Sequence, residues 1–292
     1  MRTQHTLNGR VMAHVLIAGC GVVGTALGLR LVSDKHVVWG LRRDVSKLPV
    51  AFQRVEADLQ LPRTLDRLPD IDVAVFSAAP NQSSQEAYAA LYLTGFQYLL
   101  HALRNCRRLR RVIMISSTSV YGQRHGEWVD ESSETKPTHF TGQTMLQSET
   151  LLRESQLPYT VLRAAGIYGP ERRRLLLSIQ AGKATYPNDV VQYTNRIHRD
   201  DCAGALQHLI GMAEPQALYL GADSDPIDKK TLLTWLAAQL GAPEPRASEQ
   251  PDTERTTNKR CCNDRLLESG YTLRYPSFRV GYRSILIQKG VR

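Results

Sequence analysis

Over the first two-thirds of the chain, short apolar runs alternate with segments in which apolar residues recur at helical spacing. Short apolar runs typical of buried strands cover residues 14–18, 36–40, 52–56, 71–76, 112–116 and 159–162. Segments with helical spacing lie between them, at 22–32, 62–67, 85–105 and 143–156. This strand–helix rhythm predicts an α/β fold, a Rossmann-like doubly wound parallel sheet with helices on both faces.

The rhythm changes after Pro170. Helical patterns follow at 172–181, 201–213 and 229–240. Residues 241–259, rich in Pro, Glu, Ser and Thr, predict a long exposed loop or a hairpin with mobile flanks. These segments are too sparse in apolar residues for a core of their own. We therefore expect them to form a small C-terminal substrate lobe.

The pattern thus predicts two domains and a short extension. A dinucleotide-binding domain covers 12–170, and the substrate lobe covers 171–292 with some segments returning to the first domain. Residues 1–11 are polar and basic and lack the apolar centre of a signal peptide, so we expect a flexible extension. Either Met1 or Met12 could be the true start.

A glycine-rich turn follows the first strand. Gly19, Gly21 and Gly24 have the G-x-G-x-x-G spacing and lead directly into a helical pattern. In this context the glycines allow a tight turn, close approach of a pyrophosphate and close helix packing, while the helix N-terminus faces the phosphates. The motif therefore predicts a dinucleotide site, with Cys20, Val22 and Val23 completing the turn.

The end of the second strand indicates which dinucleotide binds. Where an NAD site usually has an acid for the ribose 2′-hydroxyl, this chain continues with Arg42 and Arg43. Guanidinium groups suit a 2′-phosphate, so NADP(H) is preferred over NAD(H), although the pair could also be a solvated loop. Asp58 is placed to accept from the adenine amino group or to cap a helix. Ser77, Ala78 and Ala79, which end the fourth strand, should pass over the ribose.

The composition of the chain argues against several classes of protein. The 292 residues carry a net charge of +9, with arginine clusters at 107–111 and 172–174. No nucleic-acid motif or aromatic platform accompanies this charge, so nucleic-acid binding is disfavoured. No apolar run reaches the ~20 residues of a membrane span. The five cysteines have no metal-type spacing, and we expect reduced thiols, no metal and a cytoplasmic protein.

Four further stretches resemble a known family. They are residues 116–122 (SSTSVYG), 162–170 (LRAAGIYGP), 196–201 (RIHRDD) and the closing segment 266–281. In this order they are similar to the extended, atypical short-chain dehydrogenases/reductases, the NAD(P)-dependent epimerase/dehydratase family. The resemblance covers almost the whole chain.

The resemblance implies roles for individual residues. Ser117 would donate to the substrate oxygen, although a serine at a strand end can also satisfy backbone groups. Ser116, Ala165 and Ile167 would lie along the cofactor. Substrate contacts are implied for Tyr168, Arg172 and His198. The residues themselves favour Asp200 as the N-cap of the helix that follows.

One departure from the family concerns proton transfer. The family's catalytic Tyr-x-x-x-Lys falls, by alignment on Glu149, at Thr141 and Met145. A threonine hydroxyl is a much weaker acid than a phenol, and a thioether brings no charge to assist it. Tyr121 could supply a phenol instead, or pack in the fold, and the substrate could carry its own proton.

Two functions follow from these observations. One is an enzyme, an NAD(P)-dependent oxidoreductase or epimerase/dehydratase acting on a sugar-like or carbonyl small molecule. The alternative is a catalytically weak or inactive NADP(H)-binding sensor or regulatory module. The resemblance also implies a homodimer formed through the helices at 85–105 and 143–156.

Overall fold

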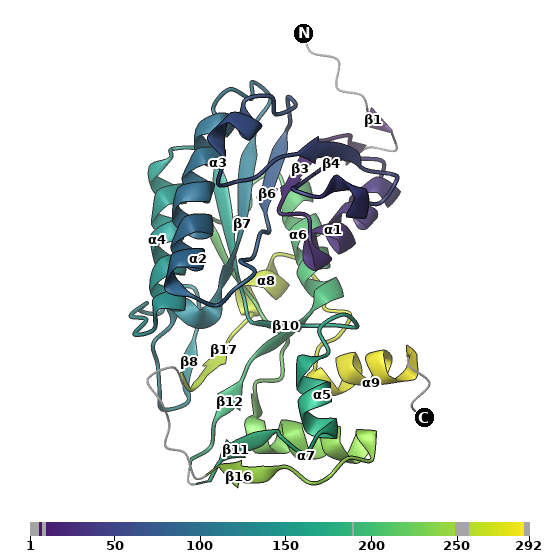
Figure 1. Ribbon diagram of the computed structural model, residues 1–292, viewed down its shortest axis with the longest axis vertical. Coiled ribbons are helices and arrows are strands. Elements are labelled where there is room, and N and C mark those ends of the chain that lie inside the picture. Colours follow the sequence, from purple (N-terminus) through teal and green to yellow (C-terminus); the bar gives the residue numbers. More distant parts are fainter. Residues whose placement is uncertain (1–5, 8–9, 189, 249–256, 289–292) are drawn as a thin grey trace. The chain divides into compact units, whose positions relative to one another are not determined.

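The predicted parallel sheet is present, with the strand order β14-β9-β7-β6-β3-β4-β5 (Figure 1). The computed structural model describes residues 6–7, 10–188, 190–248 and 257–288. The sheet strands are β3 (His14–Ala18), β4 (Val37–Arg42), β5 (Gln53–Glu56), β6 (Val73–Phe76), β7 (Arg111–Ser117), β9 (Tyr159–Ala164) and β14 (Leu218–Gly221). From β5 to β7 each neighbouring pair is parallel.

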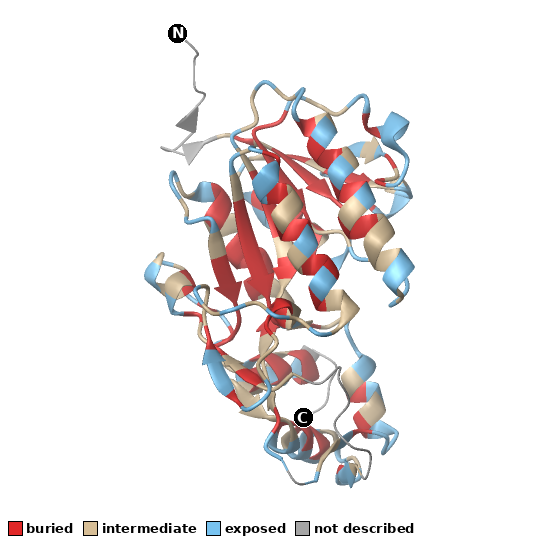
Figure 2. Cartoon of the chain, turned by 90° about the vertical axis from the view of Figure 1, so that its left-hand side faces the viewer, coloured by how far each residue is buried: buried red, intermediate tan, exposed pale blue. Residues whose placement is uncertain are grey.

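Helices cover both faces of this sheet. The helices α1 (Val22–Ser33) and α6 (Arg199–Gly211) lie on one side, and α2 (Gln85–Ala89), α3 (Phe96–Leu103) and α4 (Phe140–Glu154) on the other (Figure 1). Because both faces are covered, the central strands are almost entirely apolar and buried (Figure 2). The periodicity of the sequence therefore predicts the fold class correctly.

Two elements differ from the sequence prediction. The expected helix 85–105 is interrupted by a π-helical segment, η3 (Ala90–Gly95). Tyr92 and Phe96 both pack on Phe76, with ring centroids 6.1 and 4.3 Å away. The edge strand β14 was not predicted, because its apolar run is short and follows a helix directly.

The described chain forms two compact units that interleave along the sequence. Unit 1 consists of residues 1–116, 144–162 and 203–218, and unit 2 of residues 117–143, 163–202 and 219–292. The sequence instead predicts one boundary near residue 170. That boundary misplaces residues 117–143 and 163–170, while 203–218 is a segment that returns to the first unit. Amphipathic periodicity shows that a segment packs against something, but not against which unit.

Unit 2 is built from short strand pairs and helices. The pairs are β8 (Glu127–Val129) with β17 (Lys259–Cys261), β10 (Gly166–Tyr168) with β13 (Arg196–His198), β11 (Thr185–Pro187) with β16 (Arg246–Ser248), and β12 (Tyr193–Thr194) with β15 (Ile227–Asp228). The helices are α5 (Arg174–Gln180), α7 (Lys229–Leu240), α8 (Asp264–Glu268) and α9 (Phe278–Gln288). An apolar core joins α5, α7 and α9.

Arginines of the basic cluster at 107–111 form ion pairs and hydrogen bonds within unit 1. Arg108 pairs with the buried Asp72 at 2.9 Å. Arg111 donates to the carbonyls of Leu209, Met212 and Ala213 at the end of α6. Cations at a helix C-terminus are favoured by its dipole, so this cluster contributes to the fold.

Two predicted segments lie partly outside the described residues. In the N-terminal extension, the described parts β1 (Thr6–Leu7) and β2 (Arg10–Val11) pair antiparallel. In the predicted loop 241–259, residues 249–256 are not described, and β16 precedes that gap. No helix among the described residues has both the length and the apolar character that crossing a membrane requires.

Candidate functional site

The glycine turn between β3 and α1 has the geometry that its sequence predicts. Gly19 adopts a positive φ of 78°, and a Cβ there would overlap the backbone of Ala78. The amides of Gly19 and Cys20 both donate to the carbonyl of Leu41, at 3.0 and 3.1 Å. The turn is therefore fixed against the end of β4 and requires glycine at its first position.

The other two glycines of the motif differ in what surrounds them. A Cβ on Gly24 would come within 2.8 Å of Ile17 and 2.9 Å of the Ser77 hydroxyl. On Gly21 the nearest atom would be the Gly19 carbonyl oxygen, 3.8 Å away. Gly24 is thus required by packing within the protein, whereas Gly21 leaves open a space that a bound ligand can fill.

The N-terminus of α1 is suited to an anion. Gly21 is its N-cap, no side chain of the described residues caps it, and its first turn contains no acid. Val22 in that turn is 39% exposed. The amides and the helix dipole together favour negative charge at this end, as in phosphate sites.

The two arginines after β4 lie beside this turn. The Arg42 guanidinium donates to the carbonyl oxygen of Cys20 at 3.2 Å. Arg43 is more exposed and reaches to within 4.0 Å of the Asp58 carboxylate. Asp58 also accepts from the backbone amide of Gln60 at 3.0 Å. This hydrogen bond caps a turn. Both predicted roles of Asp58, capping and contact with the adenine, stay predictions.

Some of the other residues predicted to contact the cofactor in unit 1 form hydrogen bonds within the protein. The Ser77 hydroxyl donates to the Gly19 carbonyl at 3.1 Å, and Ala79 is exposed. Burial raises the pKa of the Cys20 thiol to about 11. Ser116 is buried, and its hydroxyl is hydrogen-bonded to the Glu149 carboxylate. Ser77 and Ala79 therefore remain candidates for ribose contact, whereas Ser116 connects β7 to α4.

These features fit a dinucleotide. The open space at Gly21 and the uncapped amides of α1 would hold the pyrophosphate. Arg42 and Arg43 would face the adenosine ribose, and Asp58 the adenine. No group of His, Cys, Asp and Glu among the described residues is arranged to hold a metal ion.

Within unit 2, two of the predicted catalytic positions lie on neighbouring segments. Ser117 ends β7, and its hydroxyl accepts from the amide of Ser119 at 3.1 Å. A Cβ on Gly142, next to Thr141, would overlap the carbonyl of Ser119. This close approach requires glycine and holds the first turn of α4 against the turn that carries Ser117.

Thr141 has a partner that the sequence reasoning missed. Its hydroxyl lies 2.9 Å from Nδ1 of His139, and its backbone amide donates to the same nitrogen at 3.4 Å. His139 is half-buried. The only sequence signal for this contact was a histidine two residues before a threonine at the start of a helix. The same spacing also suits a residue that only caps the helix. Met145 is buried and uncharged.

Tyr121 is structural rather than an alternative acid. It is fully buried, and its hydroxyl donates to the Asp130 carbonyl at 2.7 Å and accepts from Arg163 at 2.9 Å. Burial raises its pKa to about 12, although Arg163 partly opposes the shift. Both hydrogen-bonding capacities of the phenol are used within the protein. We therefore remove Tyr121 from the catalytic candidates.

Tyr168 and His198, predicted to contact substrate, are instead in the interior of unit 2. Both are buried, and their rings pack edge to face 5.2 Å apart. His198 accepts from the Asp200 amide at 3.1 Å, so His198 caps α6 where Asp200 was predicted to do so. Burial lowers the pKa of His198 and raises that of Tyr168.

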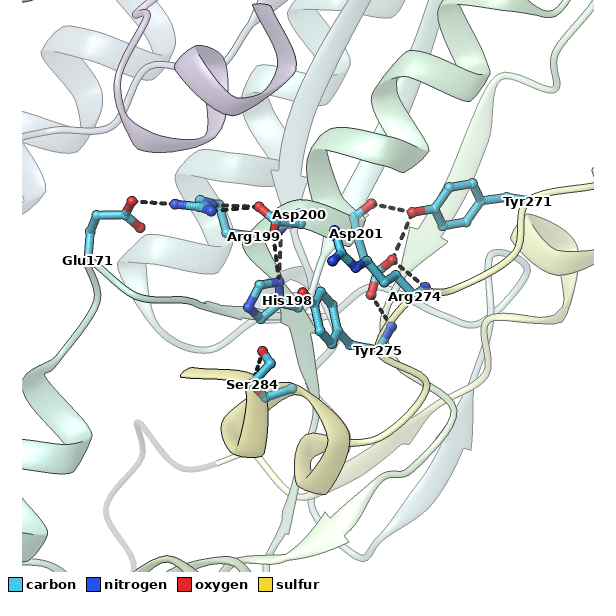
Figure 3. A network of polar contacts seen from close by, with 10 residues as sticks. Glu171, His198, Arg199, Asp200, Asp201, Tyr271, Arg274, Tyr275 and Ser284 are labelled. Carbon is cyan, nitrogen blue, oxygen red and sulfur yellow. Dashed lines mark hydrogen bonds and ion pairs between the residues drawn. The ribbon is translucent and has the colours of Figure 1, made fainter. Parts of the chain in front are cut away.

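Residues of the RIHRDD segment form a network of hydrogen bonds and ion pairs within the protein (Figure 3). The Asp201 carboxylate accepts from the Tyr271 hydroxyl at 2.9 Å and from the amides of Arg274 and Tyr275 at 2.8 Å. Arg199 bridges Asp200 and Glu171. The segment thus holds the chain after α8 against the start of α6.

Three predicted positions in unit 2 remain predictions. Ala165 is buried, and its amide donates to the Gly221 carbonyl at 2.8 Å. Ile167 pairs with Ile197 between β10 and β13. Arg172 is exposed after the Tyr168–Pro170 turn. The first two are held by backbone pairing, and the side chain of Arg172 is accessible to solvent.

Known proteins share this architecture over nearly the whole chain. A protein from Methylobacillus flagellatus, described as an NAD-dependent epimerase/dehydratase, is 36% identical, with a TM-score of 0.82 and coverage of 96% of this chain and 99% of its own. Protein YeeZ of Escherichia coli K12 is 28% identical over 91% of this chain and 97% of its own. A 3-diazoavenalumate denitrifying reductase of Streptomyces is also 28% identical, over 91% and 98%.

The family assignment agrees with the site. The profile of the NAD dependent epimerase/dehydratase family matches residues 15–216, from the first strand of the glycine motif to the end of the returning segment of unit 1. The resemblance stated from the motifs is thereby confirmed. The chain belongs to the NAD dependent epimerase/dehydratase family, an assignment that supports a general NAD(P)-dependent oxidoreductase or epimerase.

Proposed function

We propose that this protein is an NADP(H)-dependent oxidoreductase acting on a small carbonyl or sugar-like molecule. The observation that carries the proposal is the pair Arg42 and Arg43 beside the uncapped start of α1. Guanidinium groups there offer forked donors for a 2′-phosphate, where an NAD site would need a carboxylate. The Streptomyces relative, named a reductase, supports redox chemistry.

The chemistry requires both a hydride and a proton at the substrate carbonyl. Bound NADPH supplies the hydride. We assign Ser117 to hydrogen-bond the substrate oxygen and Thr141 to pass it a proton. Nδ1 of His139, which accepts from the Thr141 amide, would orient the Thr141 hydroxyl through their 2.9 Å contact, and Thr141 would regain its proton from water.

The cofactor part is tested by titrating the protein with NADPH and NADH, following nucleotide fluorescence. We expect NADPH to bind at least about tenfold more tightly, and Arg43→Ala to remove most of this preference. Lys47→Ala is the matched control, because Lys47 is an exposed cation on the same edge, paired with Asp44 at 3.0 Å. Equal affinity for both nucleotides would overturn the NADP(H) preference.

The catalytic part is tested by NADPH oxidation with a panel of aldehydes, ketones and quinones. Thr141→Val should lower kcat by about 10²-fold or more without changing NADPH affinity, and Thr141→Ser should restore it. His139→Gln, whose side-chain oxygen can still accept the Thr141 amide proton, separates orientation of the Thr141 hydroxyl from helix capping. Tight NADPH binding without turnover of any substrate would favour the sensor alternative, which the uncharged Met145 supports.

A further inference from the structure

Unit 2 contains a cavity that none of the assigned positions uses. Its volume is about 540 Å³, within the roughly 300–1,000 Å³ of small-molecule sites. The parallel pairing of β8 with β17 brings residues 128–130 beside residues 261–264, and these two segments form much of its wall. Ser117 and Thr141 are not among the lining residues. The cavity is therefore a site to be explained on its own.

The cavity wall includes an exposed tryptophan. Trp128 is 56% exposed, so much of its ring surface is accessible at the cavity wall. The Arg260 guanidinium lies 5.0 Å from the Trp128 ring centre and 4.9 Å from that of Tyr193. Arg260 thus supports the Trp128 ring from one side. The rest of the ring is available to stack on a planar group.

The charged groups lining the cavity are carboxylates. Asp130 accepts from the Ser132 amide at 2.9 Å and from the Ser132 and Ser133 hydroxyls at 2.7 and 2.9 Å. These hydrogen bonds, with that of Ser132 the largest effect, lower the pKa of Asp130 and keep it ionised. Asp264, the first residue of α8, is exposed and also lines the cavity.

Two cations that are adjacent in the sequence to lining residues are already engaged. Arg260 donates to the carbonyl of Gly126 at 2.7 Å while it stacks between its two rings. Arg265 lies 3.6 Å from the Glu131 carboxylate. The cavity therefore presents negative charge beside an aromatic surface, which opposes binding of a phosphate or a carboxylate.

We propose that this cavity binds a small molecule that carries a planar aromatic ring and a positively charged amino group. The ring would stack on Trp128, and the amino group would lie against Asp264. The site goes beyond the proposed function, since it lies within unit 2 and its ligand contacts need no nucleotide.

The proposal is tested by isothermal titration of the nucleotide-free protein with tyramine and with 4-hydroxyphenylacetate. These probes share a phenol ring and differ in the sign of their charged group. We expect tyramine to bind at least about tenfold more tightly. Equal affinities, a preference for the acid, or no binding of either probe would overturn the proposal.

Variants identify the cavity as the site. Trp128→Ala should weaken tyramine binding about tenfold, Trp128→Phe should retain most of it, and Asp264→Asn should reduce the preference for the amine. Asp44→Asn, which removes an exposed carboxylate of unit 1, is the matched control.

Circular dichroism melting checks that each variant is folded. Unchanged tyramine affinity in folded Trp128→Ala would reject this site. NADPH titration of the same variants should give wild-type affinity, so failure here is distinguishable from failure of the proposed function.

Discussion

The nucleotide cradle of unit 1 and the Trp128 cavity of unit 2 are built in opposite ways. The cradle consists of a glycine turn, an uncapped helix start and two neighbouring arginines, a combination suited to an anion. The cavity consists of side chains from two paired strands and a short helix, with carboxylates around an aromatic ring. The cradle would hold the same phosphates in any relative that uses a dinucleotide, whereas the cavity can change with single substitutions.

The largest effect is expected from adding a side chain at Gly19, the first glycine of the turn. Gly19→Ala should destabilise the protein by more than about 2 kcal/mol, because a Cβ there overlaps Ala78 at a positive φ. Urea unfolding measures the effect. A variant with wild-type stability would show that the turn adapts and that its geometry does not require glycine.

The second test separates binding from folding within the same motif. Gly21→Ala should leave stability within about 1 kcal/mol of wild type, since its Cβ would meet only the Gly19 carbonyl oxygen at 3.8 Å. It should nevertheless weaken NADPH binding about tenfold or more by occupying the space for the phosphates. Unchanged affinity would mean that the pyrophosphate does not approach Gly21.

The third test compares a buried carboxyl of each unit. In unit 1, Asp72 accepts from Arg108 and from the His14 amide at 2.7 Å. In unit 2, Asp223 is buried, one of its oxygens has no partner among the described residues, and burial raises its pKa to about 8. The folded state therefore holds a proton that the unfolded state releases above about pH 4, so the free energy of unfolding should fall as pH rises from about 4 to 8.

Asp223→Asn should remove this slope. The variant should be more stable than wild type by more than about 1 kcal/mol at pH 8, and the difference should shrink toward pH 4. Urea unfolding across this pH range measures it, with the exposed Asp66→Asn as control. A stability difference independent of pH would show that Asp223 is ionised in the folded protein.

The smallest expected effect concerns thiol labelling. Cys261 and Cys262 both line the cavity, but Cys262 is half-buried, whereas Cys261 is buried with a pKa raised to about 12. Iodoacetamide should label Cys262 before Cys261 without changing the melting temperature, as mass spectrometry can show. Tyramine should slow labelling of Cys262 but not of the half-buried Cys106 in unit 1. Faster labelling of Cys261 would contradict the described burial.

The two regions also differ in how far the sequence predicts them. The β3–turn–α1 segment is local, so the spacing of Gly19, Gly21 and Gly24 was sufficient to predict the geometry of its turn, while the role of the arginines at the end of β4 stays a prediction. The cavity brings together residues more than 130 positions apart through β8 and β17, and no period in the sequence indicates that pairing. The roles of His198 and Tyr168 were misjudged because a motif does not show which side chains become buried. The His139–Thr141 contact depends on a helix start three residues earlier than periodicity placed it.

The interleaving of the two units has a consequence for protein synthesis. Arg111 is made early, but its partners are the carbonyls of Leu209, Met212 and Ala213, which leave the ribosome about a hundred residues later. The nucleotide-binding unit therefore cannot finish folding until the chain has passed residue 218, by which time the segments 117–143 and 163–202 of the other unit have already emerged. Unit 2 finishes later still, because its residues 219–292 are made last, and a ribosome stalled before residue 203 would hold unit 1 without most of α6.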